Sequence, residues 1–463
     1  MEYKRLLAAG LTCAVLLSLP STALAVRKGS DGPKAAGKLD TTQIVPVTSG
    51  DLSFGQIEGR VLANNPNVKA AQEGLNQAKS MNWNKALGEL DDAIEEMEDL
   101  IDSLSNTSTS AISAASMSLA TSLSDLQLAE DDLTRMQSAA SAARNVADIS
   151  RMTSMATYSA AQAESLKSTL ENLEDQREDL KKQRDDYPKT IEDTERMVDY
   201  TVDQIVSGAE SLYLTILTTQ LQQESLRDTQ LSTAKTVEEM QLRYDLGQIS
   251  AQTLLQVQNG YATLVNTAAG LDNTLGTLRS SLQSLMGEVP DGSLVLTEVP
   301  DVTQAQLDAI RFDEDLVKAK EASYTLYNAA RTVEKAEDDM DTARKDHGKK
   351  SYQYQMAEHA YQSAVYQQTA AISSFELSFQ NLYQAIAPAQ ATLAVKEGDL
   401  IYQEQACAAA ELKYQQGNIS ANSLQEAVNA RESARRDVEA ARLDLFTAYH
   451  AYQQAVEKGL VSG

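Results

Sequence analysis

The chain is poor in the residues that interrupt or cross-link a fold. Its 463 residues include only two cysteines, eight prolines and one tryptophan. Because Cys13 lies in the apolar start of the chain, Cys407 is left without a partner, and we expect no intramolecular disulfide in the mature protein. A chain with few helix breakers, rich in alanine, leucine, glutamine, serine and glutamate, is typical of long helices that are stabilised by packing.

Basic residues are also scarce. There are 40 lysines and arginines against 66 aspartates and glutamates, which gives a formal net charge of −26 at pH 7. Such an acidic surface repels nucleic acid and anionic lipid headgroups, so no nucleic-acid partner is expected.

Sequence patterns that would support catalysis are missing. The three histidines, His347, His359 and His450, have no cysteine or acidic partner at metal-ligand spacing, so we expect them at the surface. The sequence contains no glycine-rich phosphate loop, no Gly-x-Ser-x-Gly and no paired cysteines. We therefore expect neither an enzyme nor a cofactor or metal site.

The first 25 residues have the pattern of a secretory signal peptide. A charged start precedes the apolar run Leu6–Leu19, and the segment ends in Ala-x-Ala, which predicts cleavage after Ala25. A retained membrane anchor is the alternative, but the apolar run is short for a membrane span. Residues 26–50 have no apolar period and are interpreted as a flexible arm.

A long region without helix breakers follows. Between Gly88 and Gly208 there is no glycine, and Pro188 is the only proline, which predicts mostly helix. The polar cluster 105–110 (SNTSTS) is the best candidate for a turn within it. The acidic blocks at 89–103 and 171–186 are interpreted as solvated helix faces with local ion pairs.

Three segments carry strict heptad patterns, each with one apolar stripe that requires a partner helix. The positions are Val198, Val202, Ile205, Ala209, Leu212 and Ile216 in the first; Val257, Tyr261, Leu264, Ala268, Leu271, Leu275, Leu278, Leu282 and Leu285 in the second; and Ile372, Phe375, Phe379, Leu382, Ile386, Ala389 and Leu393 in the third. Between the second and third lies GEVPDGSLVLTEVPDV (287–302), which predicts a linker with one short strand.

One nine-residue stretch occurs twice, as LRYDLGQIS (242–250) and LKYQQGNIS (412–420). In each copy a glycine, Gly247 or Gly417, can take the left-handed conformation that ends a helix. Ser250 and Ser420 can then cap the next helix through their hydroxyl groups. The pattern predicts two sharp turns, each at the end of a long antiparallel helix hairpin, and the helix before the second turn is expected from about Lys349 to Gln415.

Three features together resemble the TolC-type outer membrane efflux protein family. LSFGQIEGRVLANNPNVKAAQEGLNQA (52–78) is similar to the opening helix of that family. The pattern Tyr-x-x-Gly-x-x-Ser-x-x-x-Leu, which begins at Tyr244 and again at Tyr414, resembles the periplasmic tips of the family. LMG (285–287) resembles the close of the first repeat.

The resemblance implies an all-α protomer made of two internally repeated long antiparallel helical hairpins, with little or no β-structure. It implies a homotrimer that forms a passive export duct in the cell envelope, at an outer membrane. The tips, with Tyr244, Gly247, Ser250, Tyr414, Gly417 and Ser420, would dock onto a periplasmic or extracytoplasmic adaptor protein coupled to an inner-membrane transporter.

Two further roles are open at the tips. The family places carboxylates just past them, and here only Glu426 stands at such a position, with an exposed helix glutamate as the alternative. Tyr244 and Tyr414 would pack across neighbouring hairpins, face the adaptor or pack beneath their own turns.

The sequence departs from the family in one respect. Family members interrupt each helix pair with a β-hairpin of an outer-membrane barrel, and no alternating ten-residue strands are found here. The second repeat has a short turn at His347 and Gly348 instead, and the first has a helical insertion at about 85–187. The expected domains are the first repeat (51–288), a linker (289–305) and the second repeat (306–463). The alternative function is a non-conducting helical spacer of the cell envelope.

Overall fold

The computed structural model describes residues 50–127 and 132–461, so the expected signal peptide and nearly all of the expected arm lie outside the described residues. The described part is almost entirely helical, which confirms the predicted all-α class. No helix within it has both the length and the apolar character that a membrane crossing requires.

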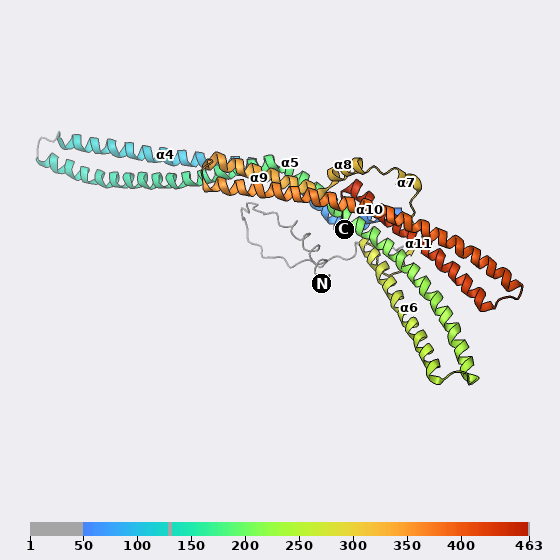
Figure 1. The fold of residues 1–463 in the computed structure, drawn as a ribbon. Helices are drawn as coiled ribbons and strands as arrows, with labels where there is room; N and C mark the ends of the chain where they lie inside the picture. Colours follow the sequence, from blue (N-terminus) through green and yellow to red (C-terminus); the bar gives the residue numbers. More distant parts are fainter. Residues whose placement is uncertain (1–49, 128–131, 462–463) are drawn as a thin grey trace. The chain divides into compact units, whose positions relative to one another are not determined.

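The first half of the described chain ends in three long helices. Its elements are strand β1 (Asp51–Leu52), a short 3-10 helix (Phe54–Gln56), α2 (Ile57–Asn64), α3 (Pro66–Lys79), α4 (Trp83–Gln127), α5 (Asp132–Asp245) and α6 (Ala251–Leu285). Helix α4 packs on the first part of α5, and α6 packs on its last part, so that one helix serves two hairpins (Figure 1).

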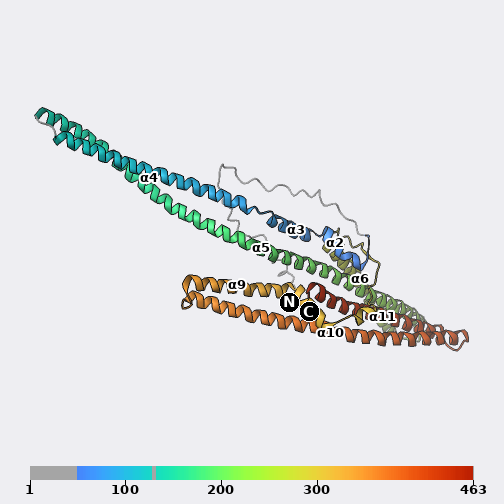
Figure 2. The same ribbon diagram turned by 90° about the horizontal axis from the view of Figure 1, so that it is seen from above.

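The second half repeats this plan on a smaller scale. Its elements are β2 (Val295–Leu296), α7 (Gln304–Asp308), α8 (Phe312–Ala322), α9 (Tyr324–His347), α10 (Tyr352–Gln415) and α11 (Ala421–Lys458). Helix α10 packs against α9 along its first part and α11 along its last part (Figure 2). The predicted bounds of the helix before the second turn are confirmed to within three residues. The assignment of these halves as repeats, with 85–187 as an insertion, stays a prediction.

The turn predicted at residues 105–110 is wrong, because α4 runs through them without a break. The hydroxyl groups of Thr107 and Thr109 donate to the backbone carbonyls of Ser103 and Ser105, four residues earlier. Serine and threonine favour turns because their hydroxyl groups offer the backbone an alternative to the hydrogen bonds of a helix, but a hydroxyl group can also bond to a carbonyl inside a helix. In α4 the hydroxyl groups bond in this second way, so the polar run stays helical.

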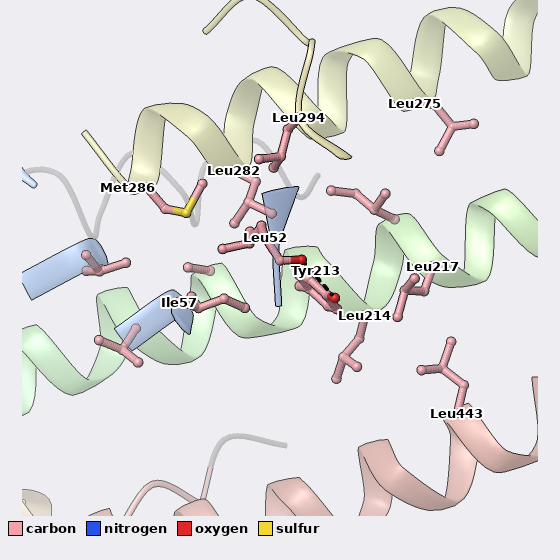
Figure 3. Close-up of a cluster of buried hydrophobic side chains, with 14 of the residues drawn as sticks. Leu52, Ile57, Tyr213, Leu214, Leu217, Leu275, Leu282, Met286, Leu294 and Leu443 are labelled. Carbon is pink, nitrogen blue, oxygen red and sulfur yellow. Dashed lines mark hydrogen bonds between the residues drawn. The ribbon is translucent and has the colours of Figure 1, made fainter. Parts of the chain in front are cut away.

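The heptad stripes form the core, as predicted. In the last part of α5, Ile205 and Leu212 pack against a buried cluster that includes Ala209 and Ile216. Figure 3 shows this cluster, to which α6 contributes Leu275 and Leu282 and α11 contributes Leu443. In α10 the stripe residues Phe375, Phe379 and Ile386 are buried in a second cluster with α8 and α11.

A two-stranded parallel sheet ties the linker to the start of the described chain. Strand β2 confirms the predicted short strand, and it pairs with β1, which the sequence did not indicate. The buried Tyr213 of α5 donates its hydroxyl hydrogen bond to the carbonyl of Glu298, at 2.6 Å, just past β2. This polar contact fixes the linker onto the long helix.

Two of the stretches that carry the family resemblance meet in space. Asn65 accepts hydrogen bonds from the backbone of Asn67 and Val68, which caps α3, and its amide donates to the carbonyl of Leu285 at 2.7 Å. Gly287 has a φ of 70°, and a Cβ there would lie 2.3 Å from the carbonyl oxygen of Asn64. Only glycine therefore fits where the two stretches touch.

A cluster of charged and hydroxyl groups joins the first half to the second. Asp193 of α5 accepts hydrogen bonds from Arg331 and Tyr327 of α9, both at 2.8 Å, and from Lys335 at 3.3 Å. Burial by itself raises the pKa of Asp193, but the bonds from Arg331, Tyr327 and Lys335 outweigh it and lower the pKa to about 2. The cluster therefore stabilises the fold while the carboxylate is charged.

The replacement Asp193→Asn should lower the midpoint of thermal unfolding at pH 7. Because the folded pKa lies below the ordinary value of 3.8, the contribution is present above about pH 4 and is lost as the pH falls towards 2. The difference between wild type and variant should shrink over that range. Asp341→Asn is the control, since Asp341 pairs only weakly with Arg344, at 3.9 Å on the same helix. A difference that stays constant down to pH 2 would show that the charge of Asp193 is not the cause.

Candidate functional site: the two helical turns

The turn between α5 and α6 has the geometry that ends a helix at a glycine. Gly247 has a φ of 71°, its amide donates to the carbonyl of Tyr244, and the amide of Gln248 donates to the carbonyl of Arg243, both at 2.8 Å. These two bonds form a Schellman motif. The hydroxyl oxygen of Ser250 accepts a bond from the amide of Thr253 at 3.1 Å and so caps α6.

The turn between α10 and α11 repeats this geometry. Gly417 has a φ of 73°, and its amide donates to the carbonyl of Tyr414 at 2.9 Å. The amide of Asn418 donates to the carbonyl of Lys413 at 2.8 Å, and Ser420 caps α11 by accepting from the amide of Ser423 at 3.1 Å. The predicted conformations of both turns are confirmed.

Large apolar side chains stand exposed around both turns. Tyr244 is 40% exposed and Tyr414 is 44% exposed, so neither ring is buried beneath its own turn. Leu242 before the first turn, Leu246 within it and Leu412 before the second turn are exposed by 59% to 64%. Each turn therefore presents one leucine and one tyrosine at matching positions, Leu242 and Tyr244 in the first copy and Leu412 and Tyr414 in the second.

Glu426 is exposed near the start of α11. A single protomer does not test whether it lines a constriction, so that role stays a prediction.

One of the three histidines does not have the expected surface position. His347 and His359 are exposed, but His450 of α11 is only 20% exposed, and its ring stacks on Phe446. Its Nε2 lies 3.0 Å from a carboxylate oxygen of Glu210 on α5, and Gln454 donates to the same carboxylate at 2.6 Å. Residues 240 positions apart make this contact, so spacing along the sequence could not indicate it.

A cleft with a volume of about 350 Å³ lies beside this histidine, between α5 and α11. Hydroxyl, amide and carboxylate groups line much of it, including Ser207, Thr215, Asp444 and Thr447. Within the described residues no group of three or more His, Cys, Asp or Glu side chains is placed to hold a metal ion. The two turns, which repeat one geometry in both halves of the chain, are the stronger candidate site.

Comparisons with known proteins were made for the whole chain. No protein-family model matches it, and no curated protein matches it. Among solved structures it is similar to the outer-membrane channel OprN, with 13% identity over 94% of this chain and 99% of that one, at a TM-score of 0.49. It is also similar to the outer membrane protein VceC from Vibrio cholerae, with 17% identity over 58% of this chain and 74% of that one, at a TM-score of 0.43.

A third similar structure is the open state of the MtrE outer membrane channel from Neisseria gonorrhoeae, with 13% identity over 61% of this chain and 72% of that one, at a TM-score of 0.41. OprN and MtrE are outer-membrane channels.

Replacing glycine by alanine should change the free energy of unfolding in opposite directions at Gly247 and Gly260, in the hairpin of α5 and α6. A Cβ added at either residue would have no atom within 4 Å, so the effect depends on the backbone conformation alone. Gly247→Ala forces a side chain into the left-handed region and should cost about 1 kcal/mol. Gly260→Ala, inside α6, should stabilise by about 0.5–1 kcal/mol. Denaturant unfolding followed by circular dichroism measures both, and changes of the same sign would contradict the geometry described for the turn.

Proposed function

We propose that the mature chain is one protomer of a homotrimeric exported duct that serves an efflux or type I secretion system. The two turns dock onto an extracytoplasmic adaptor protein, which couples the duct to an inner-membrane transporter. Its place is the cell envelope, at the outer membrane. Transport through the duct is passive, since the sequence supplies no phosphate-binding loop to hydrolyse a nucleotide.

The observation that carries this proposal is the repetition of one exposed turn. Both copies have the same left-handed glycine, the same serine cap and the same exposed tyrosine, 170 residues apart (417 − 247). A turn that served only to reverse the chain would need the glycine and the cap. It would not need a leucine and a tyrosine held out to solvent in both copies.

The exposed side chains at the turns favour a protein partner. Leaving a leucine in water forgoes roughly 1.5–3 kcal/mol relative to burying it fully. Leu242, Leu246 and Leu412 present such surface within one or two turns of the two glycines. An adaptor that covers both turns of each protomer would bury these residues together with the two tyrosine rings, and aromatic anchors of this kind dominate binding at many interfaces.

The charge of the chain suits an aqueous duct. With a net charge of −26, its surface is strongly hydrated, and helices that line a shared channel would present carboxylates to the water inside it. Glu426, exposed just past the second turn, is the carboxylate that we assign to the narrow end of the duct.

The experiment co-expresses the tagged mature chain with a candidate extracytoplasmic adaptor protein and measures how much adaptor the chain captures. Gly247→Val combined with Gly417→Val places a β-branched side chain at two positive φ angles, which distorts both turns but leaves the helices in place. We expect the affinity for the adaptor, and with it the capture, to fall at least about tenfold, which is a loss of roughly 1.4 kcal/mol or more of binding free energy. Gly260→Ala is the matched control on α6 and should capture as the wild type does.

The helical content and export of the variants must match the wild type for the comparison to stand. Circular dichroism and the amount of protein recovered outside the cytoplasm measure these. Capture that is unchanged in the double variant would rule out docking through the turns and would favour the alternative of a spacer protein.

A further inference from the structure

In the hairpin formed by α4 and the first part of α5, the size of the buried side chains changes along the helices. On α4, one heptad position holds the buried residues Leu87, Ile94, Ile101, Ser108 and Ala115, in that order. This position holds large apolar residues up to Ile101 and small residues beyond it. Leu104 of α4 and Ile149 and Met152 of α5 are half-buried there, so past residue 101 the fully buried positions are small and the large residues are only partly covered.

The opposite helix shows the same change. Ala156, Ser159 and Ala163 of α5 are buried in the contact, whereas Leu170 and Leu173 occupy it further along the chain. The hydroxyl of Ser108 donates to the carbonyl of Ala156 at 3.0 Å, so the side chain of one helix touches the backbone of the other. Small side chains allow this close approach.

Beyond the change, six large apolar side chains are on the outside. They are 45% to 70% exposed, namely Ile112, Met117, Leu119, Val146, Met155 and Tyr158. We call residues 103–121 of α4 and 146–163 of α5 the neutral segment. In it the fully buried residues are small, and six large apolar side chains remain exposed. Covering this apolar surface would lower the free energy.

The distribution of charged residues indicates that a second copy of this chain covers the neutral segment. From Glu89 to Asp102, α4 carries eight carboxylates, whereas it carries no charged residue from 103 to 124. On α5 the neutral segment has two charged residues, Asp148 and Arg151. They form an ion pair at 3.7 Å, so their charges balance each other. Two copies of a chain with a net charge of −26 repel each other over most of their surfaces, but they can meet at a neutral one.

Most of the hydroxyl groups of the neutral segment already have partners. Those of Thr107, Thr109, Ser110 and Ser116 on α4 donate to carbonyls of their own helix, and so do Thr153 and Thr157 on α5. Removing water from this surface leaves these donors bonded, which keeps the cost of a protein contact low. A lipid surface is less favourable because Asp148 and Arg151 are 55% and 83% exposed, and their charges would have to leave water.

We infer that the neutral segment is a contact between copies of this chain. Its partner is the same segment of a second copy, held by the exposed methionine, leucine, isoleucine and tyrosine side chains. The contact goes beyond adaptor docking and does not depend on the turns at Gly247 and Gly417.

The test is cross-linking of the full mature chain in dilute solution by a short bismaleimide. Cys407 is 1% exposed and should not react, so a single introduced thiol reports the contact. Met117→Cys lies in the neutral segment and should give covalent dimers. Leu100→Cys is the control, because it is an exposed apolar position on the same helix but among the carboxylates. Dimers from neither variant, or from both equally, would overturn the inference.

A second measurement uses charge. Ile112→Glu combined with Tyr158→Glu adds two like charges to each copy at exposed positions, so folding should be unaffected. In the Met117→Cys background we expect the yield of covalent dimers to fall at least about tenfold. Leu100→Glu in the same background should leave the yield unchanged. An unchanged yield in the double variant would contradict the inference.

Two further results separate the alternatives. If the wild type, but not the Ile112→Glu, Tyr158→Glu variant, floats with phosphatidylcholine vesicles, the cover is lipid and the inference is wrong. If Met117→Cys forms dimers also in the background of Gly247→Val and Gly417→Val, the contact stands whether or not the turns dock an adaptor.

Discussion

A one-sided apolar stripe on each long helix is the constraint on which this structure depends. A heptad pattern gives a helix one face to bury, and that face needs another helix of matching length. Helices α5 and α10 meet this need twice each, because their two ends pack against different partners. The glycine turns decide which helix covers which stripe. Each one reverses the chain so that the second half of a hairpin lies on the stripe of the first.

The second constraint is the junction where the hairpins are tied together. Asn65 and Gly287 bring the start of α3 against the end of α6, and Tyr213 holds the linker to α5. The ion cluster at Asp193 joins α5 to α9 by hydrogen bonds from three side chains. These polar contacts connect segments that are far apart in the sequence. The hairpin ends lie beyond them, and Tyr244, Leu246 and Met117 are exposed towards those ends.

The sequence predicted the features that depend on local rules. The turns at Gly247 and Gly417 follow from one residue without a Cβ and one hydroxyl cap, and the buried stripes follow from spacing alone. The polar run at 105–110 misled because its hydroxyl groups bond within the helix instead of ending it. The burial of His450 and the pairing of β1 with β2 could not be predicted, since both depend on contacts across more than 200 residues. The exposed apolar side chains of the hairpin of α4 could not be predicted either, because their exposure depends on how the two helices pack.

We propose that sister copies close these hairpins into a tube. The mass of the mature chain in a mild detergent or buffer, determined by light scattering after size-exclusion chromatography, tests this. We expect one species with the mass of three chains over a wide range of concentration. A stable, fully helical monomer at the highest concentration would contradict it.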